Sequence, residues 1–204
     1  MIFMAIAMLV SFLLGGFPTA YVVARVTKGI DIRQHGSGNV GATNTLRAVG
    51  KIPGLIVLLG DIAKGIIAVT LVATVALRMS AEVSPDRMRA WCGGMVVLGH
   101  IFNVFMGGRG GKGVATSAGV LIMLSPLAMG IGAAVFIAAV AVTGYVSLGS
   151  ILASVVLPFA VLLTGAPASY VALSCVLSIL VVAKHKANIQ RLLTGRESKL
   201  TRPR

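Results

Sequence analysis

The sequence has few charged residues and very few acidic ones. Charged side chains make up 11% of the 204 residues, whereas about 25% is usual in soluble domains. Hydrophobic side chains make up 57%, and the mean hydropathy is +0.97. This composition excludes a soluble globular domain and indicates an integral membrane protein. Eighteen Lys and Arg against five Asp and Glu give a net charge of +13, an excess that membrane proteins typically carry on their cytoplasmic side.

Aromatic residues and cysteines are also scarce. An aromatic content of 5% leaves little surface for base stacking, which argues against a nucleic-acid partner. The two cysteines, Cys92 and Cys175, lie in apolar segments. We expect them to pack as small hydrophobic side chains, with no disulfide and no bound metal.

Long apolar runs divide the chain into membrane spans, each needing about 20 helical residues. The first run, residues 2–24, has no cationic segment before it, so we expect a retained span and not a cleaved signal. Further spans are expected at residues 52–77, 90–106, 146–163 and 169–183. A last apolar run, residues 114–142, is long for one span and short for two. Ser125-Pro126 interrupts it, and proline disfavours a continuous helix.

The positions of Lys and Arg decide the topology. Five lie in residues 25–51, two in 107–113 and seven in 184–204, whereas the connection 78–89 holds three. If residues 114–142 cross twice, or dip in and return, the first three segments share one face. We therefore predict an all-α integral membrane protein that forms a single domain over residues 1–204. It would have seven transmembrane helices, the fourth and fifth short or partly re-entrant, with an outside N-terminus and a cytoplasmic C-terminus.

Polar residues concentrate in segments that this topology places on the cytoplasmic side. The expected loops cover about residues 25–51, 107–113 and 143–147, followed by a basic tail over residues 184–204. They contain GSGNVGATN (36–44), GGRGGKGVAT (107–116), a short cluster with Thr143, Tyr145 and Ser147, and HKANIQR (185–191). Irregular backbone near membrane depth is tolerated where it is buried in protein or lines a polar cavity. We therefore expect these segments to converge on a cavity open to the cytoplasm.

The residue types in these segments are typical of phosphate binding. Glycine allows consecutive N–H groups to converge on an anion, Arg47 offers a two-pronged donor and Lys112 a point charge. A Walker A loop is excluded, because Met106 and Gly113 stand where its first glycine and its Ser or Thr should be. A nucleophile elbow, a His-x4-Asp pair and paired carboxylates are also missing. What remains is a phosphate site without an obvious protein base.

Three residues inside the predicted spans carry charge or a titratable ring. Asp61 and Lys64 are three positions apart on one helix face, so they either form a structural ion pair or take a direct substrate role. His100 ends the third span, and we expect it either to brace the glycine segment that follows or to contact substrate.

Taken together, these motifs resemble those of the bacterial membrane glycerol-3-phosphate acyltransferases that use acyl-phosphate as donor. The resemblance rests on GSGNVGATN with Arg47, GHIFNVFMGGRGGKGVAT (99–116) and HKANIQRLLTGRE (185–197), in that order. It extends to D-x-x-K-G at residues 61–65 and to Tyr145-Val-Ser147. Each motif is weak alone, but their order across seven apolar segments is specific.

The resemblance implies a reaction and a location. A fatty acyl group would pass from acyl-phosphate to the 1-hydroxyl of sn-glycerol 3-phosphate, giving lysophosphatidate and inorganic phosphate, in the first acylation step of phospholipid synthesis. It implies a multi-pass protein of the bacterial inner membrane whose active site faces the cytoplasm. Its partners would be the two substrates and membrane lipids, without cofactor or metal. Because acyl-phosphate carries a good leaving group, positioning and charge stabilisation would suffice for catalysis.

The resemblance also implies site residues. The loop around residues 37–43 and the amides near residues 110–113 would cradle the phosphate of acyl-phosphate, with structural turns as the alternative. Four residues, Arg47, Lys112, His185 and Asn188, would hold glycerol 3-phosphate. The hydroxyl proton could pass to His185 or to the donor's own phosphate, and we favour the phosphate. The complete prediction has Ser37, Arg47, Lys112, His185 and Asn188 as catalytic residues, and Gly38, Asn39, Gly41, Thr43, Asn44, Gly110, Gly111, Gly113, Thr116 and Ser147 as substrate contacts.

Two other classes of function stay open at this point. A transporter for an organic phosphate would present broken helix ends to an anion, but it predicts polar groups on both sides of the midplane and an internal repeat. Neither is evident in the sequence. A non-enzymatic lipid-binding scaffold would need fewer ordered glycine amides.

Overall fold

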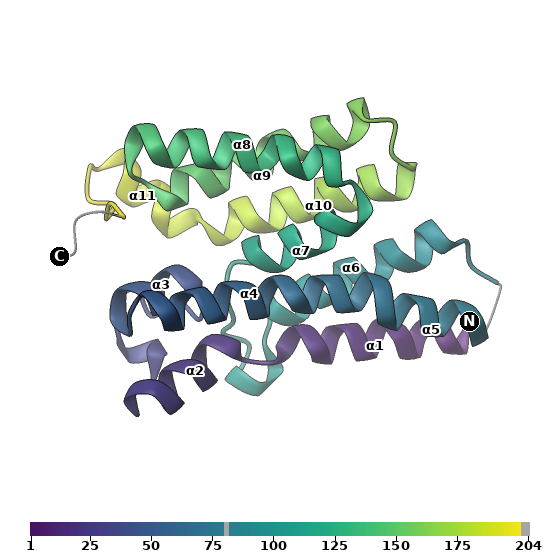
Figure 1. Ribbon diagram of the computed structural model, residues 1–204, viewed down its shortest axis with the longest axis horizontal. Helices are drawn as coiled ribbons and strands as arrows, with labels where there is room; N and C mark the ends of the chain where they lie inside the picture. Colours follow the sequence, from purple (N-terminus) through teal and green to yellow (C-terminus); the bar gives the residue numbers. More distant parts are fainter. Residues whose placement is uncertain (80–81, 201–204) are drawn as a thin grey trace. The chain divides into compact units, whose positions relative to one another are not determined.

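The computed structural model describes residues 1–79 and 82–200, and every regular element in them is helical (Figure 1). The predicted all-α fold is confirmed for this part of the chain. Residues 80–81 of the predicted connection and 201–204 of the predicted basic tail lie outside the described residues. The chain folds as two compact units, residues 1–124 and the residues from 125 onward.

The first unit carries the first two glycine-rich motifs. Its elements are α1 (Ile2–Gly16), α2 (Thr19–Lys28), the 3-10 turn η1 (Ile32–Gln34), α3 (Ala42–Ala48), α4 (Lys51–Ile67), the π-helix η2 (Ala68–Val72), α5 (Ala73–Met79), α6 (Pro85–Ile101), the 3-10 turn η3 (Val104–Met106) and α7 (Val114–Leu124). The second unit carries the third motif. It consists of α8 (Pro126–Thr143), α9 (Val146–Leu163), α10 (Ala168–Lys184) and α11 (Lys186–Leu193).

Four helical stretches are long and apolar enough to cross a membrane. They are Ile2–Lys28, Lys51–Met79, Pro126–Thr143 and Val146–Leu163, and the pair α10 and α11, bent by 56°, makes a fifth if it counts as one span. The predicted spans at 52–77, 146–163 and 169–183 match helices to within a few residues. Helix α7 has 11 residues, which is about 16 Å at the α-helical rise. It is therefore too short to cross the core alone, and the count of seven spans stays a prediction.

Several predicted boundaries need correction. The first span is not one continuous helix, because it ends at Gly16 and resumes at Thr19 around Pro18, which has no N–H to donate. Residues 25–51 are not a plain loop, since they hold the end of α2 and the whole of α3. Only residues 144 and 145 separate α8 from α9, and the basic tail begins with α11. The predicted break at Ser125-Pro126 is confirmed: α7 ends at Leu124 and α8 begins at Pro126.

Glycines let two pairs of helices in the first unit approach until their backbones touch. A Cβ on Gly15 of α1 would overlap the carbonyl oxygen of Val96 in α6, and one on Gly99 of α6 would overlap that of Phe12 in α1. Helices α4 and α7 meet in the same way at Gly65 and Gly119. Small residues serve this purpose in membrane helices because van der Waals packing, and not the hydrophobic effect, drives their association.

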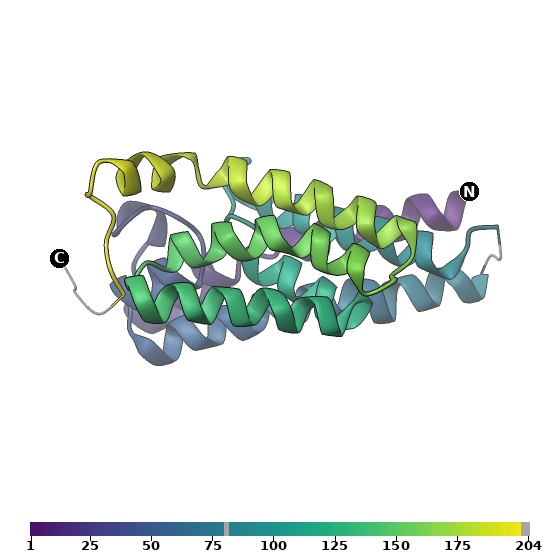
Figure 2. The ribbon, with the colours of Figure 1, turned by 90° about the horizontal axis from the view of Figure 1, so that it is seen from above.

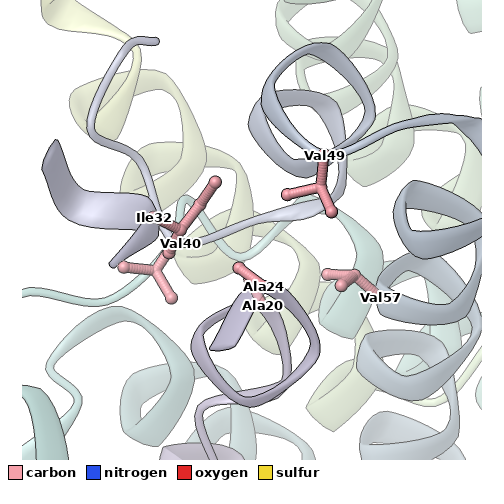
Figure 3. Close-up of a cluster of buried hydrophobic side chains, with 6 residues drawn as sticks. All are labelled: Ala20, Ala24, Ile32, Val40, Val49 and Val57. Carbon is pink, nitrogen blue, oxygen red and sulfur yellow. The ribbon is translucent and has the colours of Figure 1, made fainter. Parts of the chain in front are cut away.

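A cluster of aliphatic side chains holds the first polar loop against the helices. Figure 3 shows Ala20 and Ala24 of α2 facing Ile32 of η1, Val40 of the loop and Val57 of α4. All five are at most 4% exposed. Val40 is the one large apolar side chain within GSGNVGATN, so its burial fixes the middle of a largely polar segment.

The second unit is a row of three long helices. Helix α9 packs against both α8 and α10, as the views in Figures 1 and 2 agree. The chain reverses between α8 and α9 through Gly144, whose φ of 78° lies in the left-handed region that favours glycine. This reversal brings the hydroxyl of Ser147, in the first turn of α9, to 2.8 Å from the carboxylate of Glu197, in the C-terminal segment that follows α11.

The glycine contact between α1 and α6 gives a first prediction. Gly99→Ala forces these helices apart and is expected to lower stability by about 1–3 kcal/mol, the usual range for overpacking. The matched control is Gly130→Ala in α8, where an added Cβ meets nothing within 4 Å. Because alanine is the better helix former, this control is expected to keep or slightly raise stability. Thermal unfolding of both variants in detergent micelles measures the difference, and equal unfolding temperatures would contradict the close packing.

Candidate functional site

Asn44 organises the first glycine-rich loop from its buried position in α3. Its side-chain amide donates to the carbonyls of Ile32, His35 and Asn39 at 3.3, 3.0 and 3.1 Å. Its side-chain oxygen accepts the N–H of Ser37 at 2.9 Å. The residue is 2% exposed. One carboxamide thus satisfies four backbone groups and fixes the path of the loop, and little of the side chain is open to solvent.

Glycines in this loop have conformations that other residues rarely adopt. Gly36 and Gly38 have φ of 61° and 70°, and a Cβ on Gly36 would overlap the side-chain oxygen of Asn44. The residues around them are open to solvent: Ser37 and Arg47 are exposed, while Asn39 and Thr43 are half-buried. Gly41, which is buried, is the N-cap residue before α3, and its carbonyl accepts the hydroxyl of Thr45 at 3.1 Å. The loop therefore presents a hydroxyl, a carboxamide and a guanidinium on a fixed backbone.

The second glycine-rich loop folds back onto the end of α6. The N–H of Gly110 donates to the carbonyl of Ile101 at 3.2 Å, and that of Gly111 to the carbonyl of His100 at 3.1 Å. These two N–H groups are bonded within the protein. Gly110 and Gly111 therefore allow the loop backbone to lie directly against the end of α6. Gly113 has a φ of 86° and leads into α7. Lys112, between two buried glycines, is half-buried.

The two loops touch each other at Gly111. A Cβ there would lie 2.8 Å from the carbonyl oxygen of Val40 and would overlap the imidazole of His100. The structure therefore brings the first and second motifs together, as the sequence predicted. Thr116, which the sequence placed among the substrate contacts, is instead fully buried in α7. Within the described residues its hydroxyl has no hydrogen-bond partner.

A buried polar cluster lies behind this contact. The Lys64 ammonium is 2.8 Å from the Asp61 carboxylate, which confirms the predicted ion pair between them. Lys64 also donates to the carbonyls of Gly15 and Phe17 at 3.2 and 3.0 Å, and lies 3.4 Å from Nδ1 of His100. All three polar side chains are at most 8% exposed. Because helix α1 ends at Gly16, the ammonium satisfies carbonyls that its broken end leaves without intrahelical partners.

A small cavity adjoins the cluster. Its lining is Phe17, Pro18, Thr19, Ala20, Val40, Asp61, Lys64, His100, Asn103 and Gly111. The cavity therefore connects the break after α1 with both glycine-rich loops.

In the second unit, Glu197 gathers the third motif around one carboxylate. Its Oε1 accepts from Asn188 at 2.7 Å and from Ser147 at 2.8 Å, and its Oε2 accepts from Arg191 at 2.7 Å. The side chain is 5% exposed. Burial opposes ionisation, but the hydrogen bonds from Arg191, Asn188 and Ser147 together outweigh it and lower the pKa of Glu197. Ser147 and Asn188, both predicted site residues, are thus brought together.

His185 and the C-terminal segment complete this cluster. Nδ1 of the buried His185 ring lies 2.7 Å from the carbonyl of Val181, which can only accept, so Nδ1 carries the proton and Nε2 the lone pair of the neutral ring. The N–H of Leu200 donates to the carbonyl of Gly144 at 2.8 Å. Lys199 lies 5.4 Å from the centre of the Tyr145 ring.

Glu197 was missed as a site residue. It appears in the sequence only as the last letter of the third motif. A signal was nevertheless present, because it is one of five carboxylates in a chain with eighteen cations, and the single one in the basic tail. An isolated acid among that many bases has many potential partners.

Comparison with known proteins identifies the family of this chain. The family model described as "Glycerol-3-phosphate acyltransferase" matches residues 5–195. The chain belongs to the glycerol-3-phosphate acyltransferase family. A family relative, the glycerol-3-phosphate acyltransferase of Desulforudis audaxviator, is 47% identical over 191 residues, which cover 94% of this chain and 92% of the relative. That of Halalkalibacterium halodurans is 43% identical over 199 residues, covering 94% and 93%.

Solved structures of a family member are also similar. The crystal structure of PlsY (YgiH), an integral membrane glycerol 3-phosphate acyltransferase, in its glycerol 3-phosphate form has a TM-score of 0.87 and 37% identity, covering 96% of this chain and 94% of that one. Its lysophosphatidic acid form has a TM-score of 0.84 and 36% identity, with the same coverage. The chain therefore shares its helical fold with PlsY, an integral membrane protein.

The role of Asn44 can be tested by an almost isosteric change. Asn44→Asp replaces a donor that serves three carbonyls with an acceptor, so the buried groups lose their partners at a cost of about 1–3 kcal/mol. We expect a lower unfolding temperature and faster amide exchange in residues 36–41. Gln34→Glu, the same chemical change at an exposed position nearby, is the control and is expected to leave both unchanged. An Asn44→Asp protein that matches this control would rule out the proposed role.

The lowered pKa of Glu197 predicts a pH dependence. A carboxylate whose folded pKa is depressed stabilises the protein above its unfolded pKa, and the effect is lost as the pH falls through the folded value. Glu197→Gln is therefore expected to unfold about 2–4 °C below wild type at neutral pH, which corresponds to about 1 kcal/mol after allowance for solvent around the tail. The difference should vanish in acid.

The matched control for this pH series is Asp31→Asn. Asp31 is paired with Arg33 at 2.6 Å, and its hydrogen bonds from Arg33 lower its pKa to about 2. Because this pair lies on the surface, we expect little change in unfolding temperature at any pH. A Glu197→Gln deficit that persists unchanged in acid would show that charge is not the cause.

Proposed function

We propose that this chain transfers a fatty acyl group from acyl-phosphate to the 1-hydroxyl of sn-glycerol 3-phosphate, giving lysophosphatidate and inorganic phosphate. The observation that carries the proposal is the family match over residues 5–195, supported by similarity to PlsY structures described as its glycerol 3-phosphate and lysophosphatidic acid forms. This match makes the chain an acyltransferase, and the transporter alternative is not favoured.

The chemistry suits a site without a protein nucleophile. The 1-hydroxyl oxygen attacks the acyl carbonyl carbon, a new ester bond forms, and the bond between that carbon and the bridging phosphate oxygen breaks. The hydroxyl proton passes to the donor's own phosphate, which leaves as inorganic phosphate. The protein would then supply position and stabilise charge on the carbonyl oxygen and the phosphate.

Residues of the first loop are proposed to hold the phosphate of acyl-phosphate. Ser37, Asn39 and Thr43 offer polar side chains on a backbone that Asn44 fixes. Gly38 and Gly41 would allow close approach of the phosphate, and the backbone of the second loop, through Gly110, Gly111 and Gly113, would form the adjoining wall. The exposure of Ser37 and the partial exposure of its neighbours support this role.

Cationic and polar residues of all three motifs are proposed to hold glycerol 3-phosphate. Arg47 offers a two-pronged donor, Lys112 a point charge, and Asn188 a carboxamide. His185 would contribute a hydrogen bond through Nε2. Asn44, Thr116 and Ser147 are proposed to act through the positions of their neighbours, because the first two are buried and the hydroxyl of Ser147 is donated to Glu197.

The finer features of the sequence prediction are part of the proposal. The chain would act as one membrane domain of seven segments in the bacterial inner membrane, with its N-terminus outside and its C-terminus and active site on the cytoplasmic side. The distribution of Lys and Arg along the sequence supports this orientation. Membrane lipids would be its other partners, and neither a cofactor nor a metal is required by the reaction.

A donor comparison tests the proposal. Purified protein in lipid nanodiscs is incubated with glycerol 3-phosphate and, in parallel, acyl-phosphate, acyl-CoA or acyl carrier protein, and lysophosphatidate and phosphate are both measured. We expect equal amounts of the two products from acyl-phosphate alone. Lys112→Ala should abolish both, whereas the control Lys186→Ala, which removes an exposed lysine next to His185, should retain activity. Product from a thioester would overturn the donor, and no product from any donor would overturn the function.

The same assay decides the proton acceptor. If the donor's phosphate takes the proton, His185→Gln should retain most of its turnover at saturating substrate. A loss of about 10²–10⁴, the usual contribution of a general base, would instead assign the proton to His185.

A further inference from the structure

The cluster of Asp61, Lys64 and His100 lies where three parts of the first unit meet. Asp61 and Lys64 belong to α4, and His100 belongs to the last turn of α6. Lys64 reaches the broken end of α1 through its bonds to Gly15 and Phe17. One ammonium group thus connects α1, α4 and α6 beside Val40 and Gly111 of the two glycine-rich loops.

The cluster is unusually buried for charged groups. The Asp61 and Lys64 side chains are 4% and 6% exposed, and that of His100 is 8% exposed. Charged groups inside membrane proteins are expensive, so they are retained where they serve a function. The bonds to two backbone carbonyls and to the carboxylate satisfy the ammonium, which makes its position well defined.

Lys64 also orients the imidazole of His100. The ring's Nδ1 lies 3.4 Å from the ammonium nitrogen and 3.7 Å from the Asp61 carboxylate. The three N–H groups of the ammonium are taken by the Asp61 carboxylate and by the carbonyls of Gly15 and Phe17, so the ion pair holds the ring by packing closely around Nδ1. Nδ1 of the ring therefore faces Lys64 and Asp61, and Nε2 faces the second glycine-rich loop at Gly111.

Gly111 rests directly on that nitrogen. A Cβ at residue 111 would overlap Nε2 of His100, and it would also lie 2.8 Å from the carbonyl of Val40 in the first loop. The main chain at His100 holds the loop as well, because its carbonyl accepts the N–H of Gly111. The imidazole therefore limits how closely the backbone at Gly111 can approach the first loop. Gly111 lies one residue before Lys112.

We propose that Asp61, Lys64 and His100 are positioning residues for acyl transfer, which hold the His100 ring beneath Gly111 and thereby set the position of Lys112 relative to the first glycine-rich loop. The inference rests on the proposed function. It assigns to these three residues a role that requires no contact with substrate or reacting atoms. Their effect on catalysis passes through the loop backbone.

Two variants disrupt the cluster of Asp61, Lys64 and His100 in different ways. His100→Ala removes the imidazole and leaves the main-chain bonds. The double variant Asp61→Asn with Lys64→Met keeps the cluster electrically neutral but removes the ion pair that holds the ring. If the cluster only needs to be neutral, the double variant should behave like wild type. The control is Met88→Ala, which removes a buried side chain at the other end of α6, in a separate apolar cluster.

The experiment combines kinetics with hydrogen exchange of the substrate-free protein in nanodiscs. For both variants we expect kcat/KM for glycerol 3-phosphate to fall about 10²-fold, the effect of a misplacement of about 1 Å. Exchange in residues 107–113 should be at least about tenfold faster than in wild type, because the bonds at Gly110 and Gly111 open more often. Unfolding temperatures should stay at or above that of Met88→Ala, whose kcat/KM should remain near wild type.

Three results would overturn the inference. The first is unchanged exchange in residues 107–113 in both variants, and the second is a loss of kcat/KM no larger than that of Met88→Ala. The third is full activity of the neutral double variant. A wild-type protein that makes no lysophosphatidate would overturn the proposed function itself, whatever the exchange shows, so the two failures are distinguishable.

Discussion

The bond network of Lys64 is the constraint on which the first unit depends. In a bilayer, backbone groups have no water to bond, so each carbonyl left without an intrahelical partner needs one from the protein. Helix α1 stops at Gly16, well inside the first apolar stretch, and Lys64 bonds the carbonyls of Gly15 and Phe17. Asp61 then neutralises the ammonium at 2.8 Å. A break in one helix is thus tolerated because a charge on another satisfies it.

The break has a structural benefit for the site. It lets α2 leave the line of α1 and pack Ala20 and Ala24 against Val40, which carries the middle of the first loop (Figure 3). Glycine contacts between α1 and α6 bring His100 to the same place. Apolar packing around Val40 and the buried charge of Lys64 therefore hold the polar loops in place. Ser37 and Arg47 stay exposed to solvent.

Much of this architecture was predictable from the sequence, because the relevant signals are local. Hydropathy located the long helices, proline the break before α8, and the i, i+3 spacing the pair of Asp61 and Lys64. The concentration of glycine and polar residues located the three motifs, and their order carried the family resemblance. The prediction that residues 25–51 form a loop failed at α3, since seven residues with two threonines and an asparagine carry no strong helical pattern.

Other features depend on contacts that no local pattern reveals. Asn44 looks like a substrate ligand in GSGNVGATN, yet its amide is used by carbonyls 5, 9 and 12 residues away. Gly110 and Gly111 look like anion donors, but their N–H groups are bonded to the end of α6. Glu197 collects partners from a position 50 residues distant. Whether a polar group faces a ligand or the protein is decided by tertiary structure.

The π-helix η2 restricts how the second apolar stretch can change over evolution. In this turn the N–H of Ala73 donates to the carbonyl of Ala68, five residues back, so one residue more than an α-helix needs is accommodated. Helix α4 before it packs on α3 and α7, and helix α5 after it packs on α1 and α6. Loss of one residue in this turn would restore a regular α-helix with both halves facing as before, whereas loss of one residue from α4 or α5 would rotate one half against the other by about 100°. The π-turn is therefore the one place among the described residues of this stretch where the loss of a residue keeps the packing faces of α4 and α5, although nearly any apolar side chain would suit its lipid-facing surface.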